Sequence, residues 1–555
     1  MPAEVGPFAD EEAITAGVRG TDVSADGTAT FQSLHLLPMM AAAASWVGGD
    51  RALFRTGLVL GALGLLAMYG LASRLVRPVF AVAATAGLAA NLGFVFVTRS
   101  LYSEVPLMLC LLGGLWALEV ALATRSARRA VVAGALFGAA LMTRIDAPLH
   151  LVGLLPVGAA LTSGRLARSE ARRLGVAALT ATAGFALGLV DAVTRSRAYV
   201  ASHADELGVI AVLLVAASAT AATVVVLNRG SVRHAPRWLA AVTAVAVIVI
   251  AGALLVVRPA VQVDHNVTGD ARQTRSLQAA EDEPVDGHRS YAEDSARWQG
   301  WYLGPLAGLA AVAGVALLAG SAAGGRATRV EMLVLGAASV PLLLYLVRPS
   351  IYPDHPWAMR RFLPLPTPFL LLAAVVVADR LWSWWRTRAR AQSGALAGCL
   401  AVVLALALVV HPRKLLPVRE FHAYAGYAGV VRDLCRTMGD DAVVVVLPSR
   451  SVIDESLPQA VRSMCGVPAA AGRRDVSATL LDAPHVASMA VRWADEGRRL
   501  WLVSDDPNRL RGREVPITFD HVRTSDRELQ PTLTRMPHDY LATTRRLVAG
   551  PVAVP

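Results

Sequence analysis

The chain has 555 residues, of which 55% are hydrophobic and only 17% are charged, and its mean hydropathy is +0.48. An ordinary soluble domain carries about 25% charged residues, so a single water-soluble core is excluded. Disorder is excluded too, because disordered chains are polar and rich in charge. The formal net charge of +11 does not indicate nucleic-acid binding, since most basic residues stand at the ends of apolar segments. This composition is typical of a mainly α, polytopic membrane protein.

Residues 1–50 are predicted to form a first outer loop. The loop contains the acidic cluster Asp10-Glu11-Glu12 and then an apolar stretch over 31–48 that is typical of an interfacial segment. A carboxylate at the mouth of a membrane cavity can act as a general base toward a hydroxyl. A solvated acidic turn or a helix N-terminus is the alternative interpretation.

Twelve apolar segments follow, and we expect them to form a transmembrane domain over 51–411, since a membrane-spanning helix needs about 20 apolar residues. Two of them are short and are separated by Arg144-Ile145-Asp146, which predicts either two short helices or one re-entrant hairpin. The twelve segments are 52–73, 80–97, 103–123, 130–143, 147–162, 174–193, 207–227, 238–257, 303–322, 330–347, 362–379 and 394–411.

The arginines predict the orientation in a plasma membrane. The alternate loops that begin after 52–73 hold 18 arginines, against 7 in the short loops of the other set. Because positively charged loops stay in the cytoplasm, the N-terminus, the 258–302 loop and the residues after 411 are predicted to lie outside. No span precedes the first loop to carry it outside, so we expect the natural chain to start earlier, with one more helix before Met1.

Residues 412–555 are predicted to form an extracytoplasmic α/β domain. Helices are expected over 424–438, 455–465 and 484–497, and strands over 442–447 and 500–504. No glycine-rich phosphate loop follows either strand, so a nucleotide site is unsupported. Cys435 and Cys465 flank the first strand–helix unit and form either a disulfide, which an oxidising compartment permits, or two unpaired buried thiols.

Three further segments contain candidate site residues at the predicted outer face. Ser103 and Glu104 begin an apolar helix, and Glu104 is either a functional carboxylate or a helix-start residue that the dipole favours. Arg144 and Asp146 form either a substrate contact or an internal ion pair that lets the hairpin turn. The segment 352–361 carries Asp354, His355 and the adjacent Arg360 and Arg361. Arginine suits a phosphate through bidentate hydrogen bonds, while interfacial anchoring by Trp357 with solvated arginines is the alternative.

The order of these features resembles the GT-C superfamily of polytopic glycosyltransferases, in particular the protein O-mannosyltransferase and aminoarabinose-transferase-like branch. The resemblance is carried by the acidic pair Asp10-Glu11, by His35-Leu36-Leu37-Pro38, by Ser103-Glu104-Val105-Pro106 and by the basic turn Thr143-Arg144. It covers residues 7–165 well, is vaguer over 166–411, and does not cover the tail.

The resemblance implies transfer of a sugar from a polyprenyl-phosphate donor to an acceptor hydroxyl of the cell envelope, on the outer face and with inversion. It makes Asp10 the catalytic base with Glu11 beside it, and Glu104 the second acidic position. We expect Arg360 and Arg361, with Arg144, to hold the phosphate, and His35, Ser103, Asp146, Asp354 and His355 to contact substrate. A divalent cation that bridges Asp10, Glu104 and the phosphate is compatible with this scheme but is not required. The alternative function is a transporter or flippase of a lipid-linked or anionic substrate.

Overall fold

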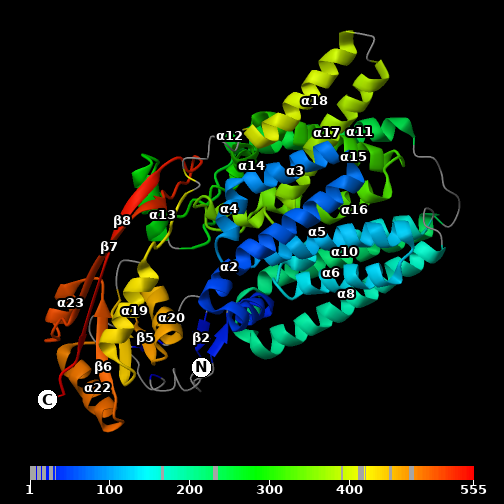
Figure 1. The fold of residues 1–555 in the computed structure, drawn as a ribbon. Helices are drawn as coiled ribbons and strands as arrows, with labels where there is room; N and C mark the ends of the chain where they lie inside the picture. The colour runs from blue at the N-terminus through cyan, green and yellow to red at the C-terminus, as the bar shows by residue number, and fades with distance from the viewer. Residues whose placement is uncertain are drawn as a thin grey trace.

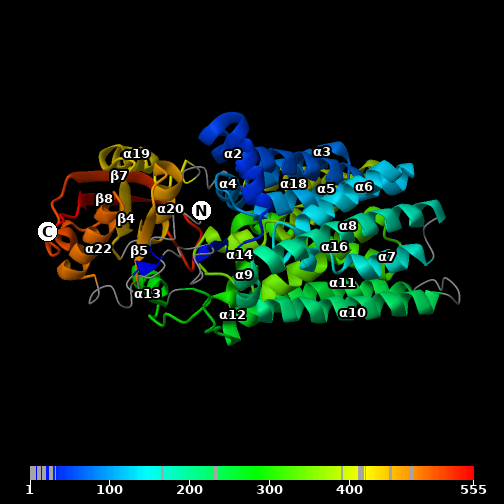
Figure 2. The ribbon, with the colours of Figure 1, turned by 90° about the horizontal axis from the view of Figure 1, so that it is seen from below.

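The computed structural model describes residues 8, 14–15, 21–23, 29–31, 33–163, 168–228, 236–269, 271–388, 392–410, 418, 420–448, 453–473 and 481–554. Figure 1 shows a layer of long helices with a sheet beyond one end of it, and the view from below agrees (Figure 2). The sheet therefore caps one end of the helical region rather than packing along its side.

The helical region consists of long helices joined by short turns, with 3-10 segments (η2, η4, η5) and one π segment (η3). Its elements are α2 (Leu36–Leu75), α3 (Pro78–Ala90), α4 (Leu92–Thr98), α5 (Glu104–Thr124), α6 (Ala127–Leu141), η2 (Ala147–His150), α7 (Leu154–Thr162), α8 (Arg168–Arg195), α9 (Arg197–Ser202), α10 (Ala204–Asn228), α11 (Arg237–Gly252), η3 (Ala253–Val257), α12 (Arg258–Val261), α13 (Ala271–Ala280), η4 (Ala292–Asp294), α14 (Ser295–Leu303), α15 (Pro305–Ala323), α16 (Arg329–Val347), η5 (Trp357–Arg361), α17 (Pro366–Arg388) and α18 (Gln392–Val410).

The protein is a multi-pass membrane protein. Within the described residues, eight helices are long and apolar enough to cross a membrane, or nine if the bent pair α3 and α4 is one span. Each of the twelve predicted spans overlaps at least one helix, but the count of twelve is not confirmed, because α6, α7 and the apolar part of α18 are too short. The first fifty residues are not a loop throughout, because α2 begins at Leu36. A kink at Gly48-Gly49 separates the first part of α2 from the membrane-spanning part that follows.

Small residues bring the membrane helices close together. A Cβ atom on Gly138 of α6 would lie 2.8 Å from the Cα of Gly184 in α8, so the two backbones are in direct contact. Such close approach replaces the hydrophobic driving force that water provides to soluble proteins. Gly114 of α5 allows a similar approach to α6, because a Cβ there would lie 2.5 Å from the Phe137 ring, and α5 carries Glu104 at its first position.

Five C-terminal strands and the N-terminal β1 form a six-stranded mixed sheet in the order β1-β5-β4-β6-β8-β7. Strands β5, β4 and β6 are parallel, whereas β1, β8 and β7 join antiparallel. The elements of this region are β1 (Ile14–Thr15), α19 (Tyr427–Met438), β4 (Ala442–Val446), α20 (Ile453–Cys465), β5 (Ala469–Gly472), α22 (Ala483–Asp495), β6 (Arg499–Ser504), α23 (Pro507–Arg511), β7 (Phe519–Leu529) and β8 (Tyr540–Pro551), and β2 (Thr21–Val23) pairs separately with β3 (Ala29–Phe31).

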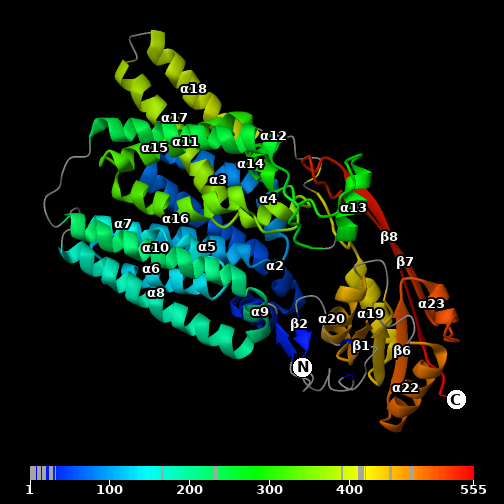
Figure 3. The same cartoon turned by 180° about the vertical axis from the view of Figure 1, so that it is seen from behind.

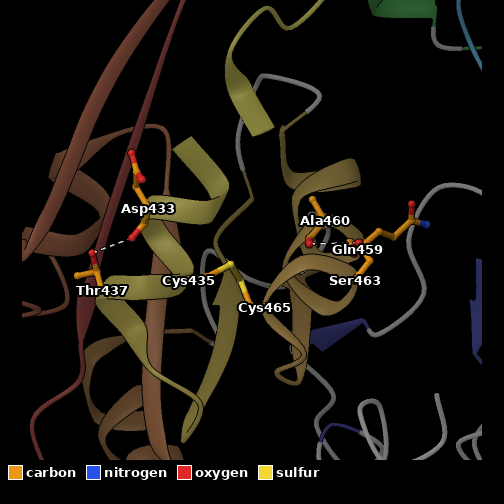
Figure 4. Close-up of a disulfide and its surroundings, with 7 residues drawn as sticks. All are labelled: Asp433, Cys435, Thr437, Gln459, Ala460, Ser463 and Cys465. Atoms are coloured by element: carbon orange, nitrogen blue, oxygen red, sulfur yellow. Dashed lines mark hydrogen bonds between the residues drawn. A yellow bond between two sulfur atoms is a disulfide. The ribbon is translucent and has the colours of Figure 1, made fainter. Parts of the chain in front are cut away.

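Both faces of this sheet are buried. Val443 and Val445 of β4 pack toward α22, while Val444 and Val446 pack toward α19 and α20. This alternation follows from the period of two along a strand, and the continuous apolar run of β4 is typical of a parallel strand covered on both sides. The structure joins Cys435 of α19 to Cys465 of α20 by a disulfide (Figure 4).

The long β7–β8 hairpin extends from the sheet back toward the helical region, as the view from behind shows (Figure 3). Its connecting residues 530–539 reach the 353–361 segment, where His355 and Thr532 form an isolated antiparallel bridge. The hairpin therefore links the C-terminal sheet to the end of the membrane helices at which Glu104 lies.

Candidate functional site

The candidate site is a buried network of ion pairs centred on Glu104, the first residue of α5. The Glu104 side chain is 2% exposed, and it accepts hydrogen bonds from Arg144 Nη1 at 2.6 Å, from Arg360 Nε at 3.0 Å and from Arg360 Nη2 at 3.1 Å. A carboxylate is favoured at a helix N-terminus, but two arginines are what allow its burial. Both oxygens of Glu104 are thus occupied by guanidinium groups.

Asp146 forms the second half of the network. Arg144 donates to both of its oxygens, at 2.8 and 2.9 Å, and Arg361 Nη1 and the Tyr345 hydroxyl donate to Oδ2 at 2.8 and 3.1 Å. Burial favours the neutral acid, but Arg144 and then Arg361 outweigh burial and hold the pKa of Asp146 well below its usual range. Asp146 is therefore a charged anchor for two arginines and not a proton donor.

Arg144 lies between the two carboxylates and connects them. Its Nη1 also donates to the Ser103 hydroxyl at 3.0 Å. Burial works against its charge, yet Asp146 and then Glu104 raise the pKa of Arg144 well above its usual value. Of the two interpretations of Arg144 and Asp146, the internal ion pair is therefore present in the structure, and it belongs to a larger cluster.

Arg360 is held between two aromatic rings and a carboxylate. Its guanidinium lies 4.1 Å from the ring centre of Tyr102 and 4.0 Å from that of Trp357, while its edge faces Glu104. Burial lowers the pKa of Arg360, and Glu104 opposes that effect. Two stacking contacts and a bidentate carboxylate make Arg360 a structural cation.

Arg361 differs from its neighbour because it has a buried donor that is unused. It donates to Asp146 and, through Nη2, to the Ser350 carbonyl at 3.0 Å, but its buried Nε has no hydrogen-bond partner among the described residues. A buried donor without a partner is costly. The five charged members of the network, two carboxylates and three arginines, carry a net charge of +1, so the cluster favours an anion.

Two cavities are linked to the network through residues 345–350. A polar cavity of about 200 Å³ has Ser350, whose carbonyl accepts from Arg361, in its lining, together with Arg258, Asp264, Ser290, Arg348 and others. An apolar cavity of about 330 Å³ is lined by Leu254, Leu255, Leu303, Leu309, Leu346, Leu370 and others.

The polar and apolar cavities are neighbours in the chain as well. The consecutive residues Leu346 and Val347 line the apolar and the polar cavity respectively. Arg348, the next residue, is exposed, and its side chain has no hydrogen-bond or ion-pair partner in the part of the chain that the structure describes. This end of α16 therefore offers an apolar surface on one side and a free cation on the other, which suits an amphiphilic anion.

Six of the residues predicted from the sequence meet in this network: Ser103, Glu104, Arg144, Asp146, Arg360 and Arg361. Tyr102, Tyr345 and Trp357 belong to it and were missed. Tyr102 and Trp357 stand two and three residues before the charged residues that they accompany, which is the signal that could have identified them. Tyr345 lies in an apolar helix and gave no such signal.

The other predicted residues lie elsewhere or are not described. His35 contacts Asp191 at the end of α8, with Nδ1 at 3.0 Å from Oδ2. His355 is buried against Trp298, Trp301 and Tyr302, on the side of its loop that faces the β7–β8 connection.

Asp10 and Glu11 lie outside the described residues. The nearest described residues on either side, Phe8 and Ile14, contact the C-terminal sheet region: Phe8 packs edge-on against Trp493, and Ile14 pairs with Gly472. Within the described ranges, no group of three or more His, Cys, Asp or Glu side chains is placed to hold a metal ion.

A comparison with protein families matches a segment near the start of the chain. Residues 46–189 match the family model described as dolichyl-phosphate-mannose-protein mannosyltransferase. The matched segment includes Ser103, Glu104, Arg144 and Asp146. Over this segment, the resemblance to the GT-C superfamily is confirmed. A comparison with curated proteins gave no match.

Two solved structures match over 99% of this chain and 92% of their own. One is ArnT from Cupriavidus metallidurans in the apo state, at 12% identity and a TM-score of 0.44. The other is the same protein bound to undecaprenyl phosphate, at 13% identity and a TM-score of 0.36. Scores this low do not support the transfer of individual residues or ligands from those structures.

Proposed function

We propose that this chain is a membrane glycosyltransferase that moves a sugar from a polyprenyl-phosphate donor to an acceptor hydroxyl of the cell envelope. The observation that carries the proposal is the network around Glu104 and Asp146, which has a net positive charge and is linked through residues 345–350 to a polar and an apolar cavity. The family-model match over 46–189 supports the same reaction class.

The donor's two parts fit the two cavities. A polyprenyl chain would occupy the apolar cavity beside Leu346, and the phosphate would lie near Arg348 and the unused Nε of Arg361. Fixed cations stabilise the charge that develops on the leaving phosphate when the bond to the sugar breaks. Arg361 is thus the better candidate for phosphate contact, and Arg360, which is enclosed by two rings and Glu104, holds the loop in place.

The reaction also needs a base for the acceptor hydroxyl. We assign this role to Asp10, with Glu11 beside it, on the resemblance to the GT-C superfamily. Glu104 is a positioning residue, because its oxygens already accept from Arg144 and Arg360. A single displacement by the acceptor oxygen, with the proton passing to Asp10 and the lipid phosphate leaving, would invert the anomeric centre.

We place the site at the outer face of the plasma membrane. The arginine bias puts the other helix ends in the cytoplasm, and the Cys435–Cys465 disulfide agrees with an oxidising compartment for the C-terminal region. The charged side chains to which we assign a role in binding or transfer, among the described residues, lie at one end of the membrane-spanning helices. A transporter is expected to carry its polar residues near mid-membrane, so the transporter alternative is not favoured.

The test uses the full-length protein in lipid nanodiscs with labelled undecaprenyl-phosphate sugars and cell-envelope fractions. We expect sugar transfer with the wild-type protein and a loss of at least about tenfold with Arg361→Gln, the scale of a charge-assisted hydrogen bond. Arg436→Gln is the matched control, because Arg436 is an exposed arginine that pairs with Asp433 on α19, away from the network and both cavities. No transfer from any polyprenyl-phosphate sugar, or equal turnover of wild type and Arg361→Gln, would contradict the proposal.

A further inference from the structure

The β7–β8 connection docks on the segment that carries Arg360 and Arg361. The backbone N–H of His355 donates to the Thr532 carbonyl at 3.0 Å, within the isolated bridge between the two residues. Thr532 is fully buried, as is the His355 ring at 1% exposure. Residues nearly 180 positions apart in the sequence thus share one buried contact.

Glu281 fixes the docked connection from a second side. It follows α13, and its carboxylate accepts from the backbone N–H of Leu533 at 2.8 Å, from that of Thr534 at 3.0 Å and from the Thr534 hydroxyl at 2.8 Å. Hydrogen bonds to an ionised acceptor are about twice as strong as those between neutral groups. Three of them to one carboxylate clamp residues 533–534 onto the outer loop.

The clamp places an apolar side chain beside the arginine segment. Leu533 is fully buried in a cluster with Trp298, Tyr302, Met359 and Phe362. Met359 and Phe362 stand immediately before and after the arginine pair, so the cluster holds both ends of it. A shift of Leu533 would leave a cavity beside these two residues, which close-packed interiors resist.

We propose that residues 530–539 are a positioning element for the arginine segment, and that Glu281 is the residue that secures it. The C-terminal sheet would then be needed to keep Arg360 and Arg361 in reach of Glu104 and Asp146. The effect on transfer rests on the proposed function, whereas the mechanical coupling of the two segments does not.

The test compares Glu281→Gln with Glu283→Gln in nanodiscs. Glu283 is the matched control, because it lies two positions further along the same loop and its carboxylate pairs only loosely, with Arg289 Nη1 at 3.9 Å. Amide hydrogen exchange of peptides covering 530–536 and 353–363 reports local opening directly. We expect Glu281→Gln to speed exchange about tenfold in both peptides and Glu283→Gln to change neither.

Binding of undecaprenyl phosphate is measured on the same samples. The expected outcome is weaker binding in Glu281→Gln, with overall helix content unchanged, and a milder effect of the same kind in Thr534→Val, which keeps the backbone bonds. Faster exchange confined to 530–536, with 353–363 unchanged, would overturn the positioning role. Failure of the wild type to bind the lipid would refute the proposed function, while the exchange data would still decide the coupling.

Discussion

Arg360 donates to both carboxylate oxygens of Glu104, although 256 positions separate the two residues in the sequence. One stands at the start of α5 and the other in the turn before α17. Their pairing brings the N-terminal and C-terminal halves of the membrane region together at one helix end, and it is the contact on which the rest of the network depends.

Removing the charge of Glu104 should disrupt this network. In Glu104→Gln, Arg144 and Arg360 lose their shared counter-ion, and breaking a buried ion pair on one side costs about 3–5 kcal/mol. We expect a clear fall in the thermal unfolding temperature in detergent and loss of sugar transfer. Glu206→Gln, at an exposed glutamate in the first turn of α10, should change neither, and an unaltered Glu104→Gln protein would argue against a structural role for the pair.

The two adjacent arginines should respond differently to substitution. Arg361→Gln should weaken undecaprenyl-phosphate binding by at least about tenfold, whereas Arg360→Gln should mainly lower the unfolding temperature, because Arg360 is stacked between Tyr102 and Trp357. Arg361→Lys should restore little, since a lysine cannot contact Asp146 and Ser350 together with a planar fork. Lipid-binding titrations and thermal scans measure both effects, and the reverse pattern would exchange the two roles.

The base assignment predicts a separation of binding from chemistry. Asp10→Asn should abolish transfer and leave donor affinity unchanged, because an amide cannot accept the acceptor proton at neutral pH. Glu12→Gln is the control within the same acidic cluster. Measured turnover in Asp10→Asn close to that of wild type would remove Asp10 as the base.

Asp354 should make stability depend on pH. Burial, and to a smaller extent Glu281, raises the pKa of Asp354 to about 7, against which a backbone hydrogen bond from Thr532 acts. The folded state then binds this proton more tightly than the unfolded state, so its contribution to stability falls as the pH rises from about 4 to about 7. Burial lowers the pKa of His355 to about 3, which acts in the opposite direction over the acid range.

Asp354→Asn isolates the first effect, because His355 is present in both proteins. The unfolding temperature of the variant relative to wild type should be higher at pH 8 than at pH 5. A difference that is the same at both values would show that Asp354 titrates normally.

The outer location of the C-terminal region can be tested in cells. Alkaline phosphatase fused after residue 554 should be active, since it folds only outside the cytoplasm, and the same enzyme fused after residue 328, in a predicted cytoplasmic loop, should be inactive. Activity of the second fusion alone would invert the proposed topology.

The site could be predicted in part because its charges interrupt apolar sequence. Glu104, Arg144 and Arg361 each stand at the end of an apolar segment on the side with fewer arginines, and polar residues at that position have few structural roles. Their convergence could not be predicted, because it depends on how α5, the 142–153 turn and η5 pack. The free Nε of Arg361 and the stacking of Arg360 are likewise consequences of packing alone.

The C-terminal sheet shows the same limit. The apolar run Ala442–Leu447 predicted β4, but β5 has the sequence Ala-Ala-Ala-Gly, which lacks β-branched residues. Strands β7 and β8 were missed because charged and polar residues line much of both, for example Arg523 and Arg545, which face each other across the pair. In the fold, these two strands extend to the arginine segment. Local sequence patterns cannot predict tertiary contacts such as that of Leu533 with Met359.

The most direct test of the account is an experimental structure of the full-length protein with undecaprenyl phosphate in a lipid environment. The account predicts the phosphate within hydrogen-bond distance of Arg361 or Arg348, with the lipid chain running past Leu346. A phosphate bound at the opposite helix ends, beside the Glu119–Arg329 pair, would contradict it.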